Sequence, residues 1–187
     1  MDELRSDAAR NRARILDVAR EIAAGGEPLA LNAVARAAGV GVGTVYRHFA
    51  TVEELEETLV WERFDDLADT LSGAGPHQFE TVLTKHFTLL VDDALFETVT
   101  ARAVPTLEHT AAMRDSLTVT LQQVLDQTRV EGALRDGINA AEVLMLMCGL
   151  AHSVRNVGLD ADSPQARMLL RVAFDGMRGD AKSSPAH

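Results

Sequence analysis

Apolar residues recur every three or four positions along most of the chain, and no stretch alternates strictly between apolar and polar residues. This spacing is typical of amphipathic helices rather than of strands. Glycine and proline clusters divide the pattern, so we predict an all-α fold of about nine helices. The expected helices cover about 6–24, 32–38, 42–49, 51–71, 77–91, 94–104, 111–131, 139–157 and 163–178.

Several of these helices have recognisable start signals. A polar residue that can cap the first turn, followed three positions later by Glu, or followed at once by Pro, favours a helix N-terminus. These starts are Thr51 with Glu54, Asn139 with Glu142, and Ser163 with Pro164. Asn32 is the expected N-cap of the helix 32–38, and Gly39 stands where a helix end favours a left-handed residue.

Two of the predicted helices, 32–38 and 42–49, are very short and are joined by a glycine-bearing turn. Together with the long helix before them they have the pattern of a helix-turn-helix, in which the second short helix enters the DNA major groove. Val45 and Phe49, four residues apart, would anchor that helix. We therefore predict a three-helix DNA-binding domain at 1–50, a larger helical domain at 51–180 and a disordered tail at 181–187.

The anchoring by Val45 and Phe49 turns a polar group of residues toward solvent. It consists of Thr44, Tyr46, Arg47 and His48. Their hydroxyl, guanidinium and imidazole groups suit phosphate oxygens and base edges. The glycines do not form a phosphate-binding loop, because GxxxxGK[ST] is absent and no strand precedes them. The alternative for His48 is a solvated surface side chain.

The charge is unevenly distributed along the chain. Its total is −10, yet residues 1–50 sum to +1 and the remainder to −11. A DNA-binding end needs only one positive face, so the total does not exclude nucleic acid. The single Cys148 excludes an internal disulfide, and the apolar run VLMLMCGLA is too short to span a bilayer. With a charged N-terminus in place of a signal peptide, we expect a cytoplasmic protein without membrane contact.

The segment AVARAAGVGVGTVYRHFATVEEL resembles the DNA-binding signature of the TetR family of transcriptional regulators, and RARILDVAREIAAGG resembles the family's first helix. The resemblance implies phosphate contacts for Thr44, Tyr46 and His48, base contacts for Val42, Gly43 and Arg47, and a backbone contact for Asn32. Two residues depart from the family pattern. Gly41 replaces a common Ser at the cap of the recognition helix, and Val52 replaces a common Lys, which removes one phosphate contact.

The resemblance also implies an operator-binding homodimer with a small-molecule effector. The helix 139–157 is apolar almost all round, and with the last helix it could pack against its copy as a four-helix dimer interface. The candidate effector-pocket residues are Trp61, Phe64, His86, Phe87, Phe96, Met113, Leu117, Leu121, Met147 and His152. The candidate interface residues are Val143, Leu146, Leu150, Val154, Met168 and Val172. Plain core packing is the alternative for most of the first set, and a central helix of a monomer is the alternative for 139–157.

Two other functional classes stay open. The chain could be a TetR-type regulator without a small-molecule ligand, acting as an activator or through a protein partner. It could also be an enzyme, but it carries no nucleophile–base pair, no metal-ligand spacing and no cofactor loop. We therefore expect no enzymatic activity, no cofactor and no metal.

Overall fold

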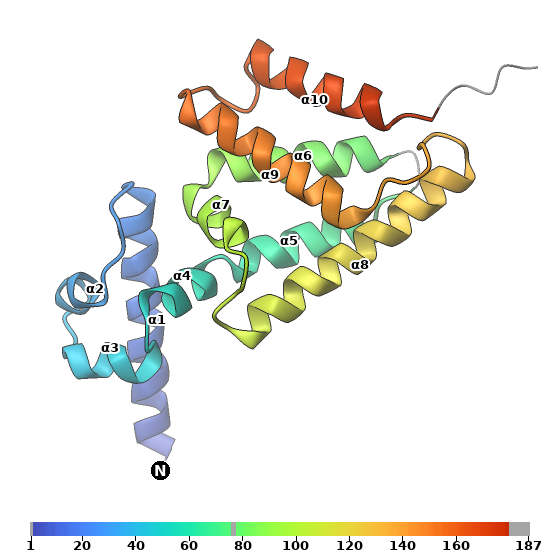
Figure 1. Cartoon of the computed structure of the whole chain (residues 1–187). Helices are drawn as coiled ribbons and strands as arrows, with labels where there is room; N and C mark the ends of the chain where they lie inside the picture. The colour runs from blue at the N-terminus through green and yellow to red at the C-terminus, as the bar shows by residue number, and fades with distance from the viewer. Residues whose placement is uncertain (1, 76–77, 180–187) are drawn as a thin grey trace, which may run out of the picture. The chain divides into compact units, whose positions relative to one another are not determined.

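The structure is a computed structural model that describes residues 2–75 and 78–179, with side chains from Asp7 onward. It confirms the all-α fold (Figure 1). The predicted disordered tail at 181–187 lies outside the described residues. The helices are α1 (Asp2–Ala24), α2 (Leu31–Ala37), α3 (Val42–His48), α4 (Val52–Leu59), α5 (Trp61–Ser72), α6 (Phe79–Asp92), α7 (Ala94–Ala101), α8 (Glu108–Val130), α9 (Ala140–Asn156) and α10 (Pro164–Met177).

The three predicted start signals form as expected. The Thr51 hydroxyl accepts a hydrogen bond from the Glu54 amide at 3.2 Å, and Glu54 in turn accepts one from the Ala50 amide at 2.7 Å. The start of α9 has the same kind of cap on the side chain of Asn139, and Ser163 caps α10 ahead of a proline at its first position. These bonds satisfy amide groups that have no partner inside a helix.

The predicted continuous helix over 51–71 is wrong. The chain leaves helical geometry at Val60 (φ −101°, ψ 0°), which separates α4 from α5. The Val60 amide bonds the Glu57 carbonyl at 3.2 Å, three residues back, so the last turn of α4 is tightened. Leu59 and Val60 are both buried at this corner. Consecutive burial of two residues favours a change of direction that the apolar spacing alone did not reveal.

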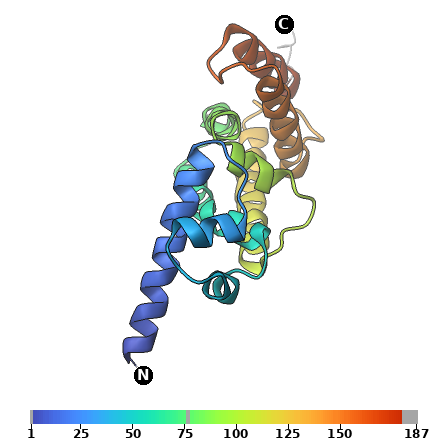
Figure 2. The ribbon, with the colours of Figure 1, turned by 90° about the vertical axis from the view of Figure 1, so that its left-hand side faces the viewer.

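The chain forms two compact units. The N-terminal unit comprises Met1–Glu62 together with Arg102–Ala111, and the body unit comprises Arg63–Ala101 together with Ala112–His187. In the N-terminal unit, α2 and α3 lie against α1 (Figure 2) and close a small apolar core. Its buried residues include Ile15, Ala19, Leu31, Val34, Val45, Phe49, Leu55 and Leu59.

The body unit has its own core, in which α6 packs against α9 and α7. Aromatic edges meet there, with the rings of Phe64 and Phe96 5.1 Å apart and those of Phe79 and Phe174 6.4 Å apart. The loop after α8 pairs with the end of α10, since the Arg135 amide donates to the Met177 carbonyl at 3.0 Å. Within the part of the chain that the structure describes, no helix is long and apolar enough to cross a membrane.

Candidate nucleic-acid interface

The turn before α3 contains two glycines, of which Gly39 has the special backbone conformation. Gly39 has a φ of 64°, the left-handed conformation that favours glycine after a helix. Gly41 is the N-cap of α3 and offers no side-chain cap, although its carbonyl accepts the Thr44 amide at 2.8 Å. Val45 and Phe49, which are 0% and 2% exposed, anchor the helix in the core of the N-terminal unit. The predicted anchoring of the second short helix is confirmed.

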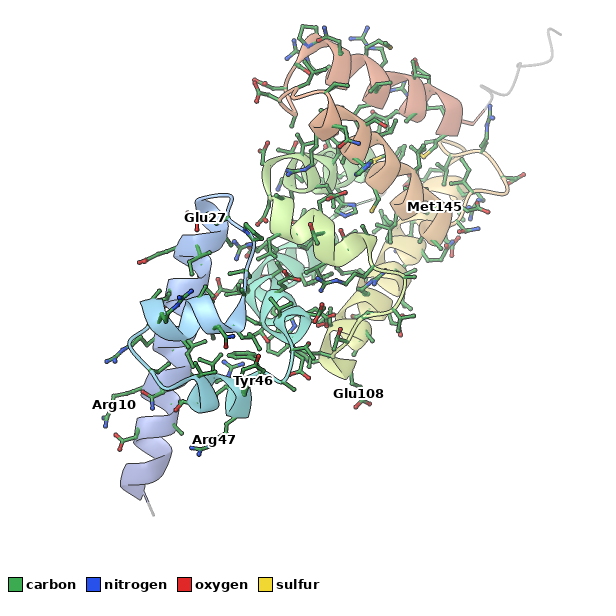
Figure 3. All side chains as sticks on the ribbon, turned by 60° about the vertical axis from the view of Figure 1, so that its left-hand side comes forward. Arg10, Glu27, Tyr46, Arg47, Glu108 and Met145 are labelled. Carbon is green, nitrogen blue, oxygen red and sulfur yellow. The ribbon has the colours of Figure 1, made fainter. Side chains whose placement is uncertain are left out.

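The anchoring presents the other side of α3 to solvent. Tyr46 is 50% exposed and Val42 is 43% exposed. Gly43 and Arg47 are also exposed, and the Arg47 side chain extends away from the helix (Figure 3). Thr44 and His48 are half-buried at the edges of this face. We call the set from Val42 to His48 without Val45 the α3 face.

The arginines of the N-terminal unit differ in how they are paired. Arg10 pairs with Asp7, and Arg20 contacts Asp17 at 2.9 Å and Glu62 at 3.6 Å. The Arg12 guanidinium lies 5.4 Å from the centre of the Phe49 ring, a cation–π distance. Arg47 has no ion pair among the described side chains. Its guanidinium is therefore free to approach an anionic partner.

A shallow hollow lies beside the α3 face. It has a volume of about 390 Å³ and brings together the start of α2, the side chain of Tyr46 and the start of α4. Its lining residues are Leu29, Ala30, Leu31, Asn32, Tyr46, Ala50, Thr51 and Val52. Asn32 does line it, but the prediction that Asn32 caps α2 is wrong, because the helix already begins at Leu31 with Ala30 as N-cap. The exposed amide of Asn32 is thus left for an outside partner.

No cationic side chain lines this hollow, and Val52 occupies the position where the family pattern favours Lys. The polar side chains among its lining residues are those of Asn32, Tyr46 and Thr51, and none of them carries a positive charge. Such neutral donors position a backbone without neutralising its charge. The weakening of DNA binding by Gly41 and Val52 stays a prediction.

Comparison with known proteins shows which family this helical arrangement resembles. The description "Bacterial regulatory proteins, tetR family" matches residues 15–58, which span the end of α1 through α4. A TetR transcription regulatory protein from Mycobacterium vanbaalenii is 30% identical, with 94% of this chain and 99% of that chain covered and a TM-score of 0.51. The chain belongs to the TetR family of transcriptional regulators.

Two further solved structures are similar over most of their length. The FadR regulator from Bacillus subtilis, solved in complex with stearoyl-CoA, is 18% identical, with 89% of this chain and 99% of that chain covered and a TM-score of 0.64. A structure that gives the molecular basis for control of antibiotic production by bacterial hormones is 25% identical, with coverages of 91% and 98% and a TM-score of 0.61. No curated protein matches the sequence.

The predicted effector-pocket residues do not share one environment. Phe64, His86, Phe87, Phe96, Leu121 and Met147 are buried in the body unit, while Met113 and Leu117 are half-buried. Trp61 belongs to the N-terminal unit, where its indole donates to the Thr110 hydroxyl at 3.0 Å and its ring lies 4.5 Å from that of His109.

The two histidines of the predicted pocket, His86 and His152, differ most clearly. The His152 side chain is 61% exposed and its ring nitrogens lie 3.0 Å from Glu97 and 2.9 Å from Asn156. His86 is buried, its ring meets that of Phe96 at 6.4 Å, and its Nδ1 has no hydrogen-bond partner. Burial lowers the pKa of His86 to about 4, so the imidazole is neutral at pH 7.

The predicted dimer residues also divide into two groups. Val143 and Val154 are 2% and 1% exposed, in the core of the body unit. Leu146, Met168 and Val172 are 41%, 53% and 62% exposed, and Leu150 is half-buried. Met145, which the sequence interpretation did not include, is 71% exposed on α9 (Figure 3). Its position next to Leu146 in the sequence is the signal that could have identified it as a candidate interface residue.

Proposed function

We propose that this TetR-family protein is a ligand-responsive repressor that binds a palindromic operator as a homodimer and is released by a small-molecule effector. The observation that carries the proposal is the α3 face, where an unpaired guanidinium stands beside hydroxyl and imidazole groups on a short helix anchored by Val45 and Phe49. In a helix-turn-helix this helix reads base edges and its flanks contact phosphates. DNA is the partner, so we expect the protein to work in the cytoplasm.

The DNA-binding part of the proposal is tested by selection. Wild-type protein is incubated with a random duplex library, and the retained fragments are sequenced and then titrated in gel shifts. We expect an inverted repeat whose half-sites are separated by roughly one helical turn, 34–36 Å, or a multiple of it. Retention of fragments with no shared sequence, at an affinity equal to that for bulk DNA, would remove the proposal.

The homodimer part rests on apolar side chains that α9 and α10 expose. A helix pair that presents Leu146, Met168 and Val172 to water is suited to pack against its copy as a four-helix interface. Sedimentation of the wild type should give a dimer, and Val172→Glu should shift it to monomer because a carboxylate would be buried unpaired. A Val172→Glu dimer as stable as wild type would place the interface elsewhere.

The effector part rests on His86. A buried imidazole nitrogen without a partner, beside the ring of Phe96, which in turn meets that of Phe64, offers one neutral hydrogen-bonding group in an apolar surrounding. The stearoyl-CoA complex of the Bacillus subtilis regulator shows that the fold can hold a long apolar chain in that protein. A ligand coupled by about 1–3 kcal/mol would lower operator affinity 5- to 150-fold.

Stearoyl-CoA, stearic acid and methyl stearate are the first probes, since they share a chain and differ in head-group charge. Because His86 is neutral, we expect methyl stearate to raise the melting temperature more than stearic acid, and His86→Leu to remove that difference. Release of the selected DNA by any of the three would connect binding to regulation. Failure of these and of wider small-molecule panels would favour the regulator without a small-molecule ligand.

A further inference from the structure

The N-terminal unit contains a segment from much later in the chain. Arg102–Ala111, which includes the loop after α7 and the first turn of α8, belongs to the same compact unit as α1 to α4. Glu108, labelled in Figure 3, marks the start of α8. The unit that carries the α3 face is therefore assembled from two separate stretches of sequence. The contacts between these two stretches determine how rigidly α4 is held.

The main contact between the two stretches, which we call the joint, is made by a buried carboxylate. Glu57, on α4, is 0% exposed. Its Oε1 accepts a hydrogen bond from the Thr106 amide at 2.7 Å, and its Oε2 accepts one from the Leu107 amide at 2.9 Å. These amides immediately precede α8, where amide groups have no partner within the helix and a negative charge is favoured by the helix dipole. A side chain of α4 thus serves as the cap of α8.

Further polar contacts surround this joint. The Thr110 hydroxyl is 0% exposed, accepts from the Trp61 indole and interacts with the Glu57 carboxylate. Arg102 pairs with Glu56 and places a guanidinium nitrogen 3.8 Å from Glu57 Oε1. Burial raises the pKa of Glu57, but the hydrogen bonds from Thr106, Leu107 and Thr110 lower it further, so that the carboxyl stays below its ordinary value. The joint is accordingly ionised at neutral pH.

An apolar residue at position 57 could fill the same volume, and buried ion pairs are often replaceable by apolar residues without loss of stability. What an apolar residue could not do is fix direction. Two charge-assisted bonds to two consecutive amides define one position of α4 relative to the segment 102–111. Glu57 is therefore better explained by positioning than by stability.

We propose that Glu57 is the positioning residue of the DNA-binding unit: its bonds to the Thr106 and Leu107 amides hold α4, and with it the helix-turn-helix, in the orientation that binds operator. The segment 102–111 continues by peptide bonds into α7 on one side and α8 on the other. Within the N-terminal unit, a displacement of this segment would reach α4 through this carboxylate. The proposal rests on the proposed DNA-binding function and not on any particular effector.

Glu57→Gln tests the proposal because the amide keeps the shape but offers one accepting oxygen in place of two. Hydrogen exchange should accelerate at least tenfold at the amides of Thr106 and Leu107 and in α4, while exchange in α10 stays unchanged. Affinity for the duplex selected by wild type should fall at least tenfold, with helical circular dichroism retained. Glu62→Gln, an exposed carboxyl on neighbouring α5, should change neither quantity.

A core variant separates positioning from general destabilisation. Leu83→Ala removes a 1% exposed side chain from α6 of the body unit and lowers the melting temperature without touching the joint. The proposal is supported if Glu57→Gln binds the duplex at least tenfold more weakly than Leu83→Ala. Equal affinities for the two variants, or accelerated exchange at Thr106 and Leu107 with wild-type affinity, would overturn it.

Two cases need a separate measurement: a Glu57→Gln variant that does not fold, and a wild type that selects no DNA. If Glu57→Gln does not fold, Trp61→Phe removes the indole N–H that contacts Thr110, together with part of the ring that lies against His109, and it should give the same pattern at smaller size. If wild type selects no DNA, the proposed function fails, and hydrogen exchange alone decides the joint. Slow exchange in α4 of Glu57→Gln would then overturn the positioning role.

Discussion

The two units of this protein differ in the side chains that their candidate binding surfaces expose. The N-terminal unit carries guanidinium, hydroxyl and imidazole groups on the α3 face. The body unit exposes methionine, leucine and valine on α9 and α10 and keeps a neutral histidine inside. Exposed polar groups suit a charged polymer, and exposed apolar groups suit a second protein surface.

This difference separates residues needed for binding from residues needed for folding. DNA recognition in this account depends on side chains that contribute little to folding, so their removal should change binding and leave stability unaltered. In the body unit, the candidate ligand group is itself part of the core. A change there should alter stability and ligand response together.

The largest effect is expected for Phe96→Ala. Phe96 is 0% exposed and lies between the rings of Phe64 and His86. Truncation leaves a cavity and should lower the free energy of unfolding by about 3–5 kcal/mol, measured by urea titration. Val119→Ala on α8, 58% exposed, is the matched control and should stay within about 0.5 kcal/mol. A small loss for Phe96→Ala would mean that the body core is not packed as described.

The next effect concerns acid stability. The pKa of His86 falls from an ordinary 6.5 to about 4 on burial, so the unfolded chain binds a proton between these values that the folded chain does not. The stabilising contribution of neutral His86 should therefore be fully present above pH 6.5. The free energy of unfolding should fall by up to about 3 kcal/mol as the pH drops toward 4.

His86→Phe should flatten that part of the pH profile, because the variant has no proton to bind at this position. Urea titrations between pH 7 and pH 4.5 measure the slope, with His152→Phe as the control, since His152 is 61% exposed. Parallel profiles for wild type and His86→Phe would show that His86 is solvated in the folded protein.

The smallest effect is expected for Val52→Lys, beside the hollow next to Tyr46. An added ammonium there should give one further phosphate contact and steepen the dependence of log affinity on log salt by about one. Gel shifts on selected and scrambled duplexes at several salt concentrations measure the slope, and both duplexes should gain equally. A gain confined to the selected duplex would show a base contact instead.

The α3 face could be predicted because all its determinants are close together in sequence. Val45 and Phe49 fix one side of a seven-residue helix, so the remaining residues must face out. The caps at Thr51, Asn139 and Ser163 are equally local. Local hydrogen-bond patterns are read directly from residue types and spacing.

The remaining features depend on tertiary contacts that no local pattern contains. Glu57 stands in the run VEELEETL, where four glutamates look alike and only the return of segment 102–111 distinguishes one of them. His86 and His152 both lie on largely apolar helices, yet one is buried and the other is paired with Glu97 at the surface. The break at Val60 likewise follows from packing at the corner between α4 and α5.

Two variants of the α3 face test whether this face reads DNA. Arg47→Ala and His48→Ala are titrated by gel shift on the selected duplex and on a scrambled duplex of equal length and salt. We predict that Arg47→Ala loses about 1–3 kcal/mol of discrimination between the duplexes, while His48→Ala weakens both equally. Unchanged discrimination in Arg47→Ala would show that Arg47 does not read the bases.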